Sequence, residues 1–370
     1  SAGEAKSYGG NITIDSDATA GVGSIGCTGT GIAKTRIIAL SGNLAFTTVS
    51  VGANATRIFG IKNNGNDNLT ISGITCPAGF SGNWSGTIAP GATQNVALIF
   101  KPTAALNYGG NLSVASNATD GSGVLPVSGC GVMPMITVKG GTFPSSSQLA
   151  GQVVSTFQIG KYEVTWGEWQ NVRDWAVANG YTDLAGVGGT YPDGSAGNFP
   201  VLYVSWYDVV KWCNAKSEKE GLTPVYQVSG VTYKTGQSTP TVNSLANGYR
   251  LPSDKEWEWA SRGGLSSKGY TFSGSNDLAL VAWFLGNSGS ASHAIGTKAA
   301  NELGIYDMSG NVWEWCWDWD AWMGGRIING GCWDINYFSW GIAVNGIIAS
   351  RAEDHRGNDV GIRLARNTGI

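Results

Sequence analysis

The side chains best suited to catalysis are scarce in this sequence. It has two histidines, His293 and His355, and six cysteines among its 370 residues. No two cysteines form a Cys-x-x-Cys pair, so their spacing argues against a zinc site. The sequence also lacks the Gly-x-Ser-x-Gly elbow that presents a nucleophilic serine to a histidine. Zinc-dependent and hydrolytic chemistry are therefore not indicated.

The most distinctive pattern lies in the segment 301–319, where aromatic side chains alternate with other types. Every odd position from Trp313 to Trp319 is tryptophan, and this period of two predicts a strand. Glu314, Cys316 and Asp318 occupy the even positions, so we expect one aromatic face and one mostly polar face. Residues 309–311 read Ser-Gly-Asn, which is a turn signal. Because indole rings are usually buried, we predict that most of these tryptophans belong to the core.

Three helices are predicted from capping patterns, in which Ser or Thr precedes an acidic residue by three positions. The patterns begin at Thr165, Ser205 and Ser253, and the helices are expected to stop near Gly180, Gly221 and Gly263. Long loops rich in small polar residues, such as 184–199 and 263–300, separate these helices. Loops of this length are typical of a fold with an irregular functional surface.

The overall composition favours an extracellular or cell-surface protein that is rich in β-structure. Charged residues make up 13% of the chain, about half the usual share, and 56 residues are glycine. The formal net charge of -3 gives no reason to expect a nucleic-acid partner. No segment is long and apolar enough to span a bilayer as a helix, so we expect no direct membrane insertion.

An internal repeat organises the N-terminal part of the chain. The sequence Tyr-Gly-Gly-Asn begins at Tyr8 and again at Tyr108, and each copy ends near a Gly-Cys pair. A repeat of about 100 residues matches the size of one β-sandwich domain. We therefore interpret residues 1–31 as the C-terminal hairpin of a truncated preceding repeat. The alternative is that they add an extra strand to the next domain.

Residues 38–132 are predicted to form one complete sandwich. Val96, Leu98 and Phe100 are apolar at alternate positions, as in a strand with one buried face. The segment resembles the immunoglobulin-like modules found in tandem on bacterial surface proteins, and a spacer is its expected role. Residues 133–370 hold 15 of the 16 tryptophans, and this abrupt change predicts a second domain.

The second domain carries a series of ordered motifs. Residues 304–315 read GIYDMSGNVWEW, and further motifs occur at 137–143, 159–165, 200–206, 249–253, 255–260, 330–331 and 361–364. Together they resemble the formylglycine-generating-enzyme (sulfatase-modifying factor) domain, which has a C-type-lectin-like fold. The resemblance implies an α+β C-type-lectin-like domain that follows an all-β immunoglobulin-like sandwich.

The same resemblance implies that the family's enzymatic activity is absent. Enzymes of this family oxidise a substrate cysteine with two cysteines of their own, which lie shortly after the Gly-Gly turn. Alignment puts Ile335 and Trp340 at these positions, so we expect no copper and no cysteine oxidation. We expect Cys316 and Cys332 to form a structural disulfide or to remain buried thiols. A formylglycine-generating-type oxidoreductase with displaced cysteines is the alternative.

A calcium site is the other chemistry that the family resemblance implies. Carried over to this sequence, its ligands are three backbone carbonyls and one carboxylate: Ser309, Gly310, Val312 and Glu314. Oxygen-only ligation at a turn suits a hard cation. The alternative is that Glu314 only hydrogen-bonds the turn.

The C-terminal segment 332–360 has no clear helical or strand period. It mixes aromatic, acidic and amide side chains, a combination typical of adaptable binding surfaces. It also lies between a Gly-Gly-x-Trp turn and a Gly-Ile-Arg-Leu motif, and in this respect it resembles the hypervariable segment in variable proteins of diversity-generating retroelements. The predicted ligand-binding residues are Asp334, Asn336, Tyr337, Phe338, Trp340, Ile342, Asn345, Ile347, Ile348, Glu353, Asp354, His355 and Asn358.

These patterns predict a non-catalytic, surface-displayed protein that binds a ligand or receptor through its C-terminal segment. The expected partner is an unidentified protein or glycan on another cell, or on a phage or host surface. The resemblances favour a bacterial or phage protein, with calcium as the one cofactor that they imply.

Overall fold

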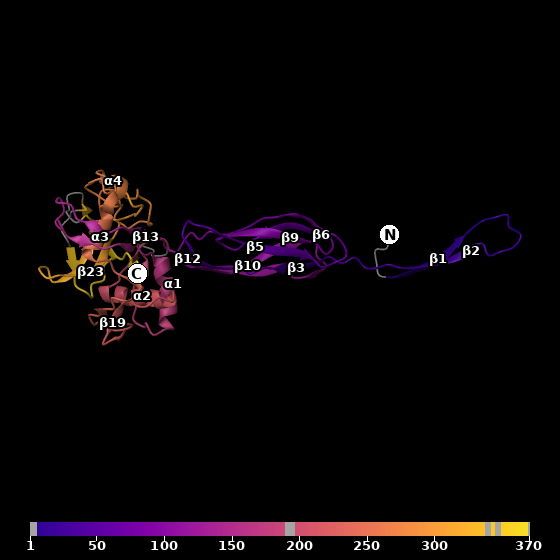
Figure 1. Ribbon diagram of the computed structural model, residues 1–370, viewed down its shortest axis with the longest axis horizontal. Coiled ribbons are helices and arrows are strands. Elements are labelled where there is room, and N and C mark those ends of the chain that lie inside the picture. Colours follow the sequence, from indigo (N-terminus) through magenta and orange to yellow (C-terminus); the bar gives the residue numbers. More distant parts are fainter. Residues whose placement is uncertain (1–5, 189–196, 337–341, 345–348, 369–370) are drawn as a thin grey trace. The chain divides into compact units, whose positions relative to one another are not determined.

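The computed structural model describes residues 6–188, 197–336, 342–344 and 349–368 (Figure 1). The chain divides into two compact units. The first comprises residues 1–102 and 108–130, and the second comprises 103–107 and 131–370. The second unit therefore begins two residues before the predicted boundary at Met133 and also includes a short segment from within the predicted sandwich.

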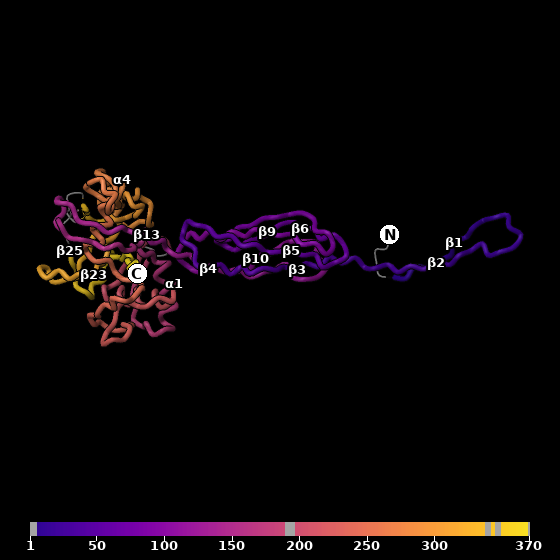
Figure 2. The backbone as a smooth tube through the Cα atoms, viewed as in Figure 1, coloured from indigo at the N-terminus to yellow at the C-terminus, as the bar shows by residue number. Residues whose placement is uncertain are grey.

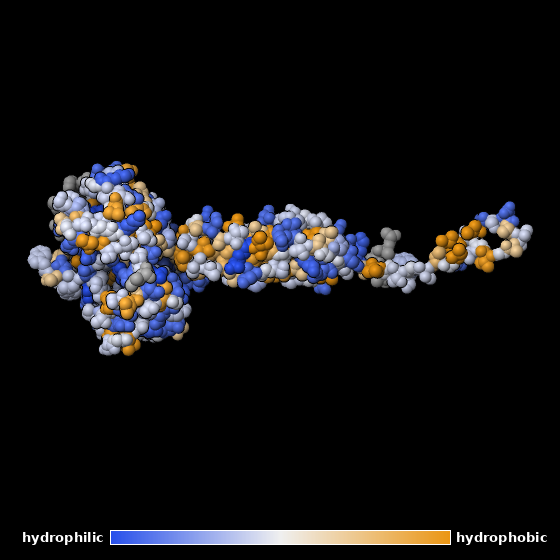
Figure 3. All heavy atoms as spheres, in the orientation of Figure 1, coloured by the Kyte–Doolittle hydropathy of each residue, from blue (hydrophilic) through white to orange (hydrophobic). Residues whose placement is uncertain are grey.

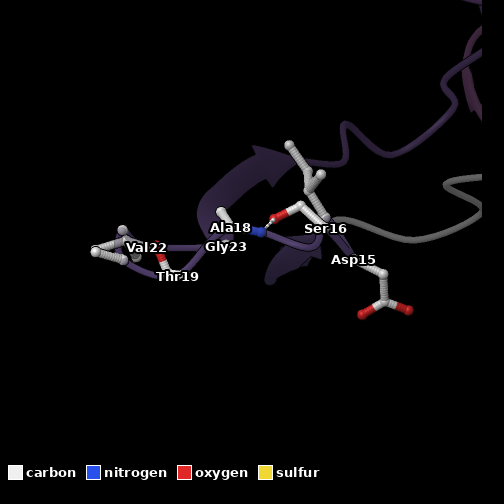
Figure 4. Close-up of a pocket in the computed structure, with 9 residues that line it drawn as sticks. Asp15, Ser16, Ala18, Thr19, Val22 and Gly23 are labelled. Carbon is white, nitrogen blue, oxygen red and sulfur yellow. Dashed lines mark hydrogen bonds between the residues drawn. The ribbon is translucent and has the colours of Figure 1, made fainter.

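The N-terminal repeat fragment forms a hairpin. Strands β1 (Ser7–Thr13) and β2 (Ser24–Thr30) pair antiparallel and make a two-stranded sheet of their own. Their joining turn surrounds an open hollow lined by residues 14–16 and 18–23, and Asp15 is the charged residue of this lining (Figure 4). The two strands pair with each other, and the sheet order of the described residues does not include them in the sheets of the next domain. Its origin in a preceding repeat stays a prediction.

Two five-stranded sheets follow. One has the order β4 (Ala45–Ser50), β12 (Val124–Val132), β10 (Asn107–Ser116), β6 (Leu69–Thr75) and β8 (Gly86–Ile88). The other has the order β11 (Asp120–Gly121), β3 (Ile37–Ser41), β5 (Ala55–Asn63), β9 (Thr93–Phe100) and β7 (Phe80–Ser81). Side chains from both sheets share one core, to which β9 contributes Val96, Leu98 and Phe100 as its alternation predicted. The immunoglobulin-like class of this sandwich stays a prediction.

The second unit contains short sheets joined by long loops (Figure 2). A four-stranded sheet has the order β13 (Met135–Val138), β16 (Phe157–Gly160), β27 (Ala365–Asn367) and β22 (Tyr249–Arg250). Smaller sheets pair β14 (Gly141–Thr142) with β15 (Val153–Val154) and β17 (Val187–Gly188) with β18 (Val201–Leu202). A further three-stranded sheet contains β20 (Val231–Thr232), β19 (Tyr226–Val228) and β21 (Thr241–Val242).

The three predicted helices are confirmed as α1 (Trp166–Val177), α2 (Trp206–Lys219) and α3 (Asp254–Ser261). Ser205 and Ser253 form complete capping boxes. At α1 the Thr165 hydroxyl accepts from the Glu168 amide, but the Glu168 carboxylate forms a buried ion pair with Lys216 of α2 instead. The predicted loop 263–300 also contains the short helix α4 (Leu278–Val281).

Helices α1 and α2 lie against each other through stacked indoles. The ring centroids of Trp169 and Trp212 are 5.0 Å apart, and both side chains are fully buried. This core continues to Trp313 and Trp315, so the prediction that most tryptophans of that strand are buried holds for its first half. Among the described residues, the helices are all too short or too polar to cross a lipid bilayer.

Candidate functional site: a surface segment on a buried frame

The candidate ligand-binding segment begins and ends in one sheet. This sheet has the order β25 (Ala349–Arg351), β24 (Gly325–Asn329), β23 (Trp313–Asp320) and β26 (Val360–Gly361). The chain leaves β24 through Gly330 and Gly331, returns through β25, and then enters β26, which runs parallel to β23. Both ends of the segment 332–360 are therefore fixed by backbone pairing.

Strand β23 differs from its sequence pattern in one respect. Glu314 and Cys316, on the face predicted to be mostly polar, are both completely buried. A bulge between Trp315 and Trp319 changes the register against β24, and only the far end of the strand is exposed. The alternation correctly indicated a strand, but it did not show that both faces of its first half are covered.

A buried charge cluster holds this strand and the turn before it. The Arg363 guanidinium donates to both oxygens of Glu314, with a closest distance of 2.6 Å, and the Trp257 indole also donates to Glu314. Glu163 accepts from the Asn311 side chain at 2.6 Å and from the Val312 amide at 3.3 Å. We name Glu163, Asp307, Glu314 and Arg363 the buried frame cluster.

Burial changes the acidity of this cluster. Loss of water around Glu163 raises the pKa of its carboxyl well above the usual range, and the nearby carboxylates of Asp307 and Glu314 add to the effect. Burial likewise raises the pKa of Asp307 to about 6. Three carboxyl groups around one guanidinium make a proton-sensitive support for the turn rather than an open catalytic site.

The one charged ligand of the predicted calcium site is bound by another side chain in this structure. Glu314, the one charged ligand of the set, has both oxygens bound by Arg363 and does not contact the turn. It is Glu163 that hydrogen-bonds the turn, so the alternative role was assigned to the wrong carboxylate. No group of three or more His, Cys, Asp or Glu side chains suited to a metal occurs among the described residues. Calcium binding at Ser309, Gly310, Val312 and Glu314 stays a prediction that requires Glu314 to leave Arg363.

The first part of the segment is anchored by a thiol and an indole. Cys332 is buried, and its thiol donates to the exposed Asp334 carboxylate at 2.9 Å. The Trp333 indole donates to the Asn358 carbonyl, which joins the two ends of the segment. Neither Cys316 nor Cys332 forms a disulfide, and burial raises the pKa of both thiols. Of the two expectations for this pair, buried thiols rather than a disulfide is the one confirmed.

The last part of the segment is anchored by two salt bridges. Glu353 pairs with Arg326 at 2.8 Å and accepts a hydrogen bond from the Tyr207 hydroxyl. Arg356 binds both oxygens of Asp208, the capping residue of α2. Between 351 and 359, half-buried residues alternate with exposed ones. Glu353 from the half-buried set and Arg356 from the exposed set hold the segment, while Asp354 and Asn358 face solvent.

The structure places the predicted ligand-binding residues in three groups. Asp334, Asn336, Asp354 and Asn358 are exposed, and His355 is half-buried with its Nε2 atom covered. Ile342 and Glu353 are corrections: Ile342 is buried in an apolar cluster with Phe272 and Leu278, and the Glu353 carboxylate is held by Arg326. Tyr337, Phe338, Trp340, Asn345, Ile347 and Ile348 lie outside the described residues.

Sequence reasoning missed two arginines that anchor the segment. Arg326 lies outside it in β24, and Arg356 lies within it. Arginine is the residue best suited to paired contacts with carboxylates, so an Arg within an acidic segment was the available signal. The partner of Arg356, Asp208, lies 148 residues away in the chain, and no local pattern connects the two residues.

Comparison with known proteins decides the family. Residues 128–368 match the model of the sulfatase-modifying factor enzyme 1-like domain. The chain belongs to this family. A chaperone protein, LppX of Paenibacillus barcinonensis, is 35% identical over 270 residues, which are 63% of this chain and 89% of that protein.

Two solved structures support the same fold. Variable protein 1 of Treponema denticola is 28% identical with a TM-score of 0.51, and the alignment covers 66% of this chain and 96% of that chain. CarF is 30% identical with a TM-score of 0.57, covering 64% of this chain and 99% of that one. The C-type-lectin-like fold and the likeness to a variable protein, both expected from the motifs, are thereby confirmed.

Proposed function

We propose that this protein is a non-catalytic binding protein and that the segment 332–360 is its ligand face. The observation that carries the proposal is that some residues of the segment bind the scaffold while their neighbours face solvent. Glu353 and Arg356 bind scaffold residues, whereas their neighbours Asp354 and Asn358 project to solvent. A backbone that is already fixed at these residues loses little conformational entropy on binding, which favours affinity.

The similar proteins support a binding role. The likeness to a variable protein extends over almost all of that chain, and LppX is named a chaperone protein, which favours a protein as the ligand. Hypervariability of the segment, display on a cell surface and a spacer role for the sandwich belong to this proposal. A reverse transcriptase gene beside a near-copy of the DNA that encodes the C-terminus is the expected genomic arrangement.

A binding screen tests the ligand face directly. Arrays of proteins and glycans are probed with the whole chain, and each hit is remeasured with a variant in which Asp334, Asn336, Asp354 and Asn358 are all replaced by Ala. We expect binding to be lost while the melting temperature stays within about 2 °C, because each site is exposed. The matched control replaces two exposed residues elsewhere, Asp174 and Lys255, and should bind as the unmodified chain does. Unchanged binding by the four-residue variant contradicts the proposal.

The alternative of a formylglycine-generating-type oxidoreductase makes a different prediction. The thiols of Cys316 and Cys332 are buried, and a high thiol pKa opposes the thiolate form that binds copper or attacks a substrate. We expect no formylglycine when the chain is incubated with copper(I), oxygen and a Cys-x-Pro-x-Arg peptide. Its appearance at an enzymatic rate, measured by mass spectrometry, overturns the non-catalytic proposal.

A further inference from the structure

The turn between β23 and β24 exposes an unusual group of large apolar side chains. Trp322 is 91% exposed, Trp319 is 50% exposed and Met323 is 40% exposed. Isolated apolar residues on a surface need no explanation, but a contiguous group marks a binding site. We name residues 319–323 the aromatic turn, which lies outside the candidate ligand face.

The aromatic turn is held in shape before any partner binds. The Asp320 carboxylate accepts from the amides of Trp322 at 2.8 Å and Met323 at 3.2 Å. The Gly324 amide closes the turn onto the Asp320 carbonyl at 2.8 Å, and its φ of 73° suits glycine. A turn fixed by these bonds presents Trp322 with little ordering cost.

The aromatic turn is continuous with the scaffold of the ligand face. Arg326 stacks its guanidinium on the rings of Trp206 at 3.8 Å and Trp319 at 5.6 Å, and the same guanidinium pairs with Glu353. A Cβ atom on Gly325 would lie 2.6 Å from the Arg351 carbonyl, so the turn adjoins the point where the segment leaves β25. The aromatic turn is therefore connected to the candidate ligand-binding segment through Arg326, which contacts both Trp319 and Glu353.

The charges around this surface select the partner. Arg326 and Arg351 are paired with Glu353 and Asp359, and Arg356 is paired with Asp208. The Asp320 carboxylate lies within the aromatic turn and is bound by backbone amides, which do not neutralise it, so it gives the turn a negative excess. This excess opposes an anionic lipid surface and favours basic side chains, which also stack well on indole rings.

We propose that the aromatic turn is a fixed anchor for a protein partner, which receives Trp322 in an apolar pocket rimmed by Lys or Arg. This inference rests on the proposed function and names the partner class for a turn that Arg326 connects to the ligand-binding segment. Trp322 is 91% exposed, so its side chain is accessible to a partner. A projecting indole beside a flexible Met side chain fits a concave protein pocket, in which tryptophan is a frequent hot spot.

Displayed peptides supply the probe. A displayed library of folded peptides is selected against the whole chain, and the affinities of the selected peptides are measured for the unmodified chain and for Trp322→Ala, Trp322→Phe and Leu245→Ala. We expect peptides rich in Lys and Arg whose affinity falls at least about tenfold with Trp322→Ala and far less with Trp322→Phe. Leu245 is 87% exposed elsewhere in the same unit, so its replacement should leave affinity unchanged. Raising NaCl from about 50 to about 500 mM should weaken binding, because exposed charges are screened.

Several results overturn this inference. One is that the selected peptides lack basic residues, and another is that their affinity does not change with Trp322→Ala. A third is Trp322-dependent binding to phosphatidylcholine vesicles or to dextran. A fourth is Trp322-dependent self-association in ultracentrifugation. The four-residue variant of Asp334, Asn336, Asp354 and Asn358 separates the two proposals. If that variant loses binding and Trp322→Ala does not, the ligand face stands and the anchor fails; if neither loses binding, both fail.

Discussion

The buried frame cluster and the segment 334–358 are both rich in polar side chains, but these side chains are buried in the cluster and partly exposed to solvent in the segment. In the cluster, Glu163, Glu314 and Arg363 are completely buried. Arg363 donates hydrogen bonds to Glu314, and Glu163 accepts one from the Asn311 side chain. In the segment, Glu353 and Arg356 bind the scaffold, whereas Asp354 and Asn358 face solvent. A surface can change freely when the residues that support it are different from those that contact the ligand.

The hairpin β1–β2 and its repeat counterpart show the same contrast for apolar residues. Leu112 of β10 is completely buried, while the corresponding Ile12 of β1 is 59% exposed. Orange apolar patches are visible on the surface of the β1–β2 hairpin (Figure 3). Equivalent sequences thus have different exposure because β10 has a second sheet opposite it and β1 forms only a two-stranded sheet.

The largest effect is expected from removing the cation of the buried frame cluster. Arg363→Ala leaves three buried carboxyl groups without their counter-charge, and breaking such a pair costs about 3–5 kcal/mol of unfolding free energy. The measurement is urea unfolding followed by tryptophan fluorescence, which reports on the domain that holds 15 of the 16 tryptophans. Arg351→Ala, which breaks the half-exposed pair with Asp359, is the control and should cost less than about 1 kcal/mol. Equal effects of the two changes contradict the distinction between frame and surface.

The next effect concerns pH. The pKa of Asp307 is about 6 in the folded protein against 3.8 for the ordinary carboxyl, so its stabilising contribution is complete below about pH 4 and is lost as pH rises through 6. A shift of about two units corresponds to at most about 3 kcal/mol. The Asn side chain of Asp307→Asn is neutral at every pH. The urea midpoint of this variant should therefore change less between about pH 4 and about pH 7 than that of the unmodified chain. Asp354→Asn on the exposed segment serves as the control and should keep the slope of the unmodified chain.

A smaller effect locates the border between the frame and the ligand face. Ile342→Val removes one buried methylene from a tight apolar cluster and should cost about 0.5–1.5 kcal/mol in the same urea experiment. Val153→Ala, at an apolar site that is 62% exposed, is the matched control and should change little. If Ile342→Val is silent, Ile342 belongs to the ligand face after all.

The smallest effects are expected on the ligand face itself. Asp354→Ser and Asn358→Ser should each change the unfolding free energy by less than about 0.5 kcal/mol, because both side chains face solvent. Glu353→Ser, in contrast, deprives Arg326 and Tyr207 of their partner and should cost clearly more. A large loss of stability from either exposed change would show that the alternation from 351 to 359 has no functional meaning.

Much of the framework was predictable because its signals are local. The capping residues Thr165, Ser205 and Ser253 identified the starts of three helices, since a cap acts within one turn. The ordered motifs identified the family, and the loss of period after Gly331 agrees with the described residues 332–336 and 352–359, none of which lies in a helix or strand. The exposed positions Asp334 and Asn358 followed from this reading.

Local sequence patterns did not show which distant residue each side chain contacts. Ile342 and Glu353 were assigned to the ligand face from their place in the chain, but Phe272 covers the first and Arg326 binds the second. Trp315 and Trp322 are the same residue type seven positions apart, and one is buried while the other is 91% exposed. The amino-acid sequence by itself determined the helices, the family and the extent of the segment. The packing of β24, α2 and the loops around β23 decided burial, because burial depends on residues that are far apart in the chain.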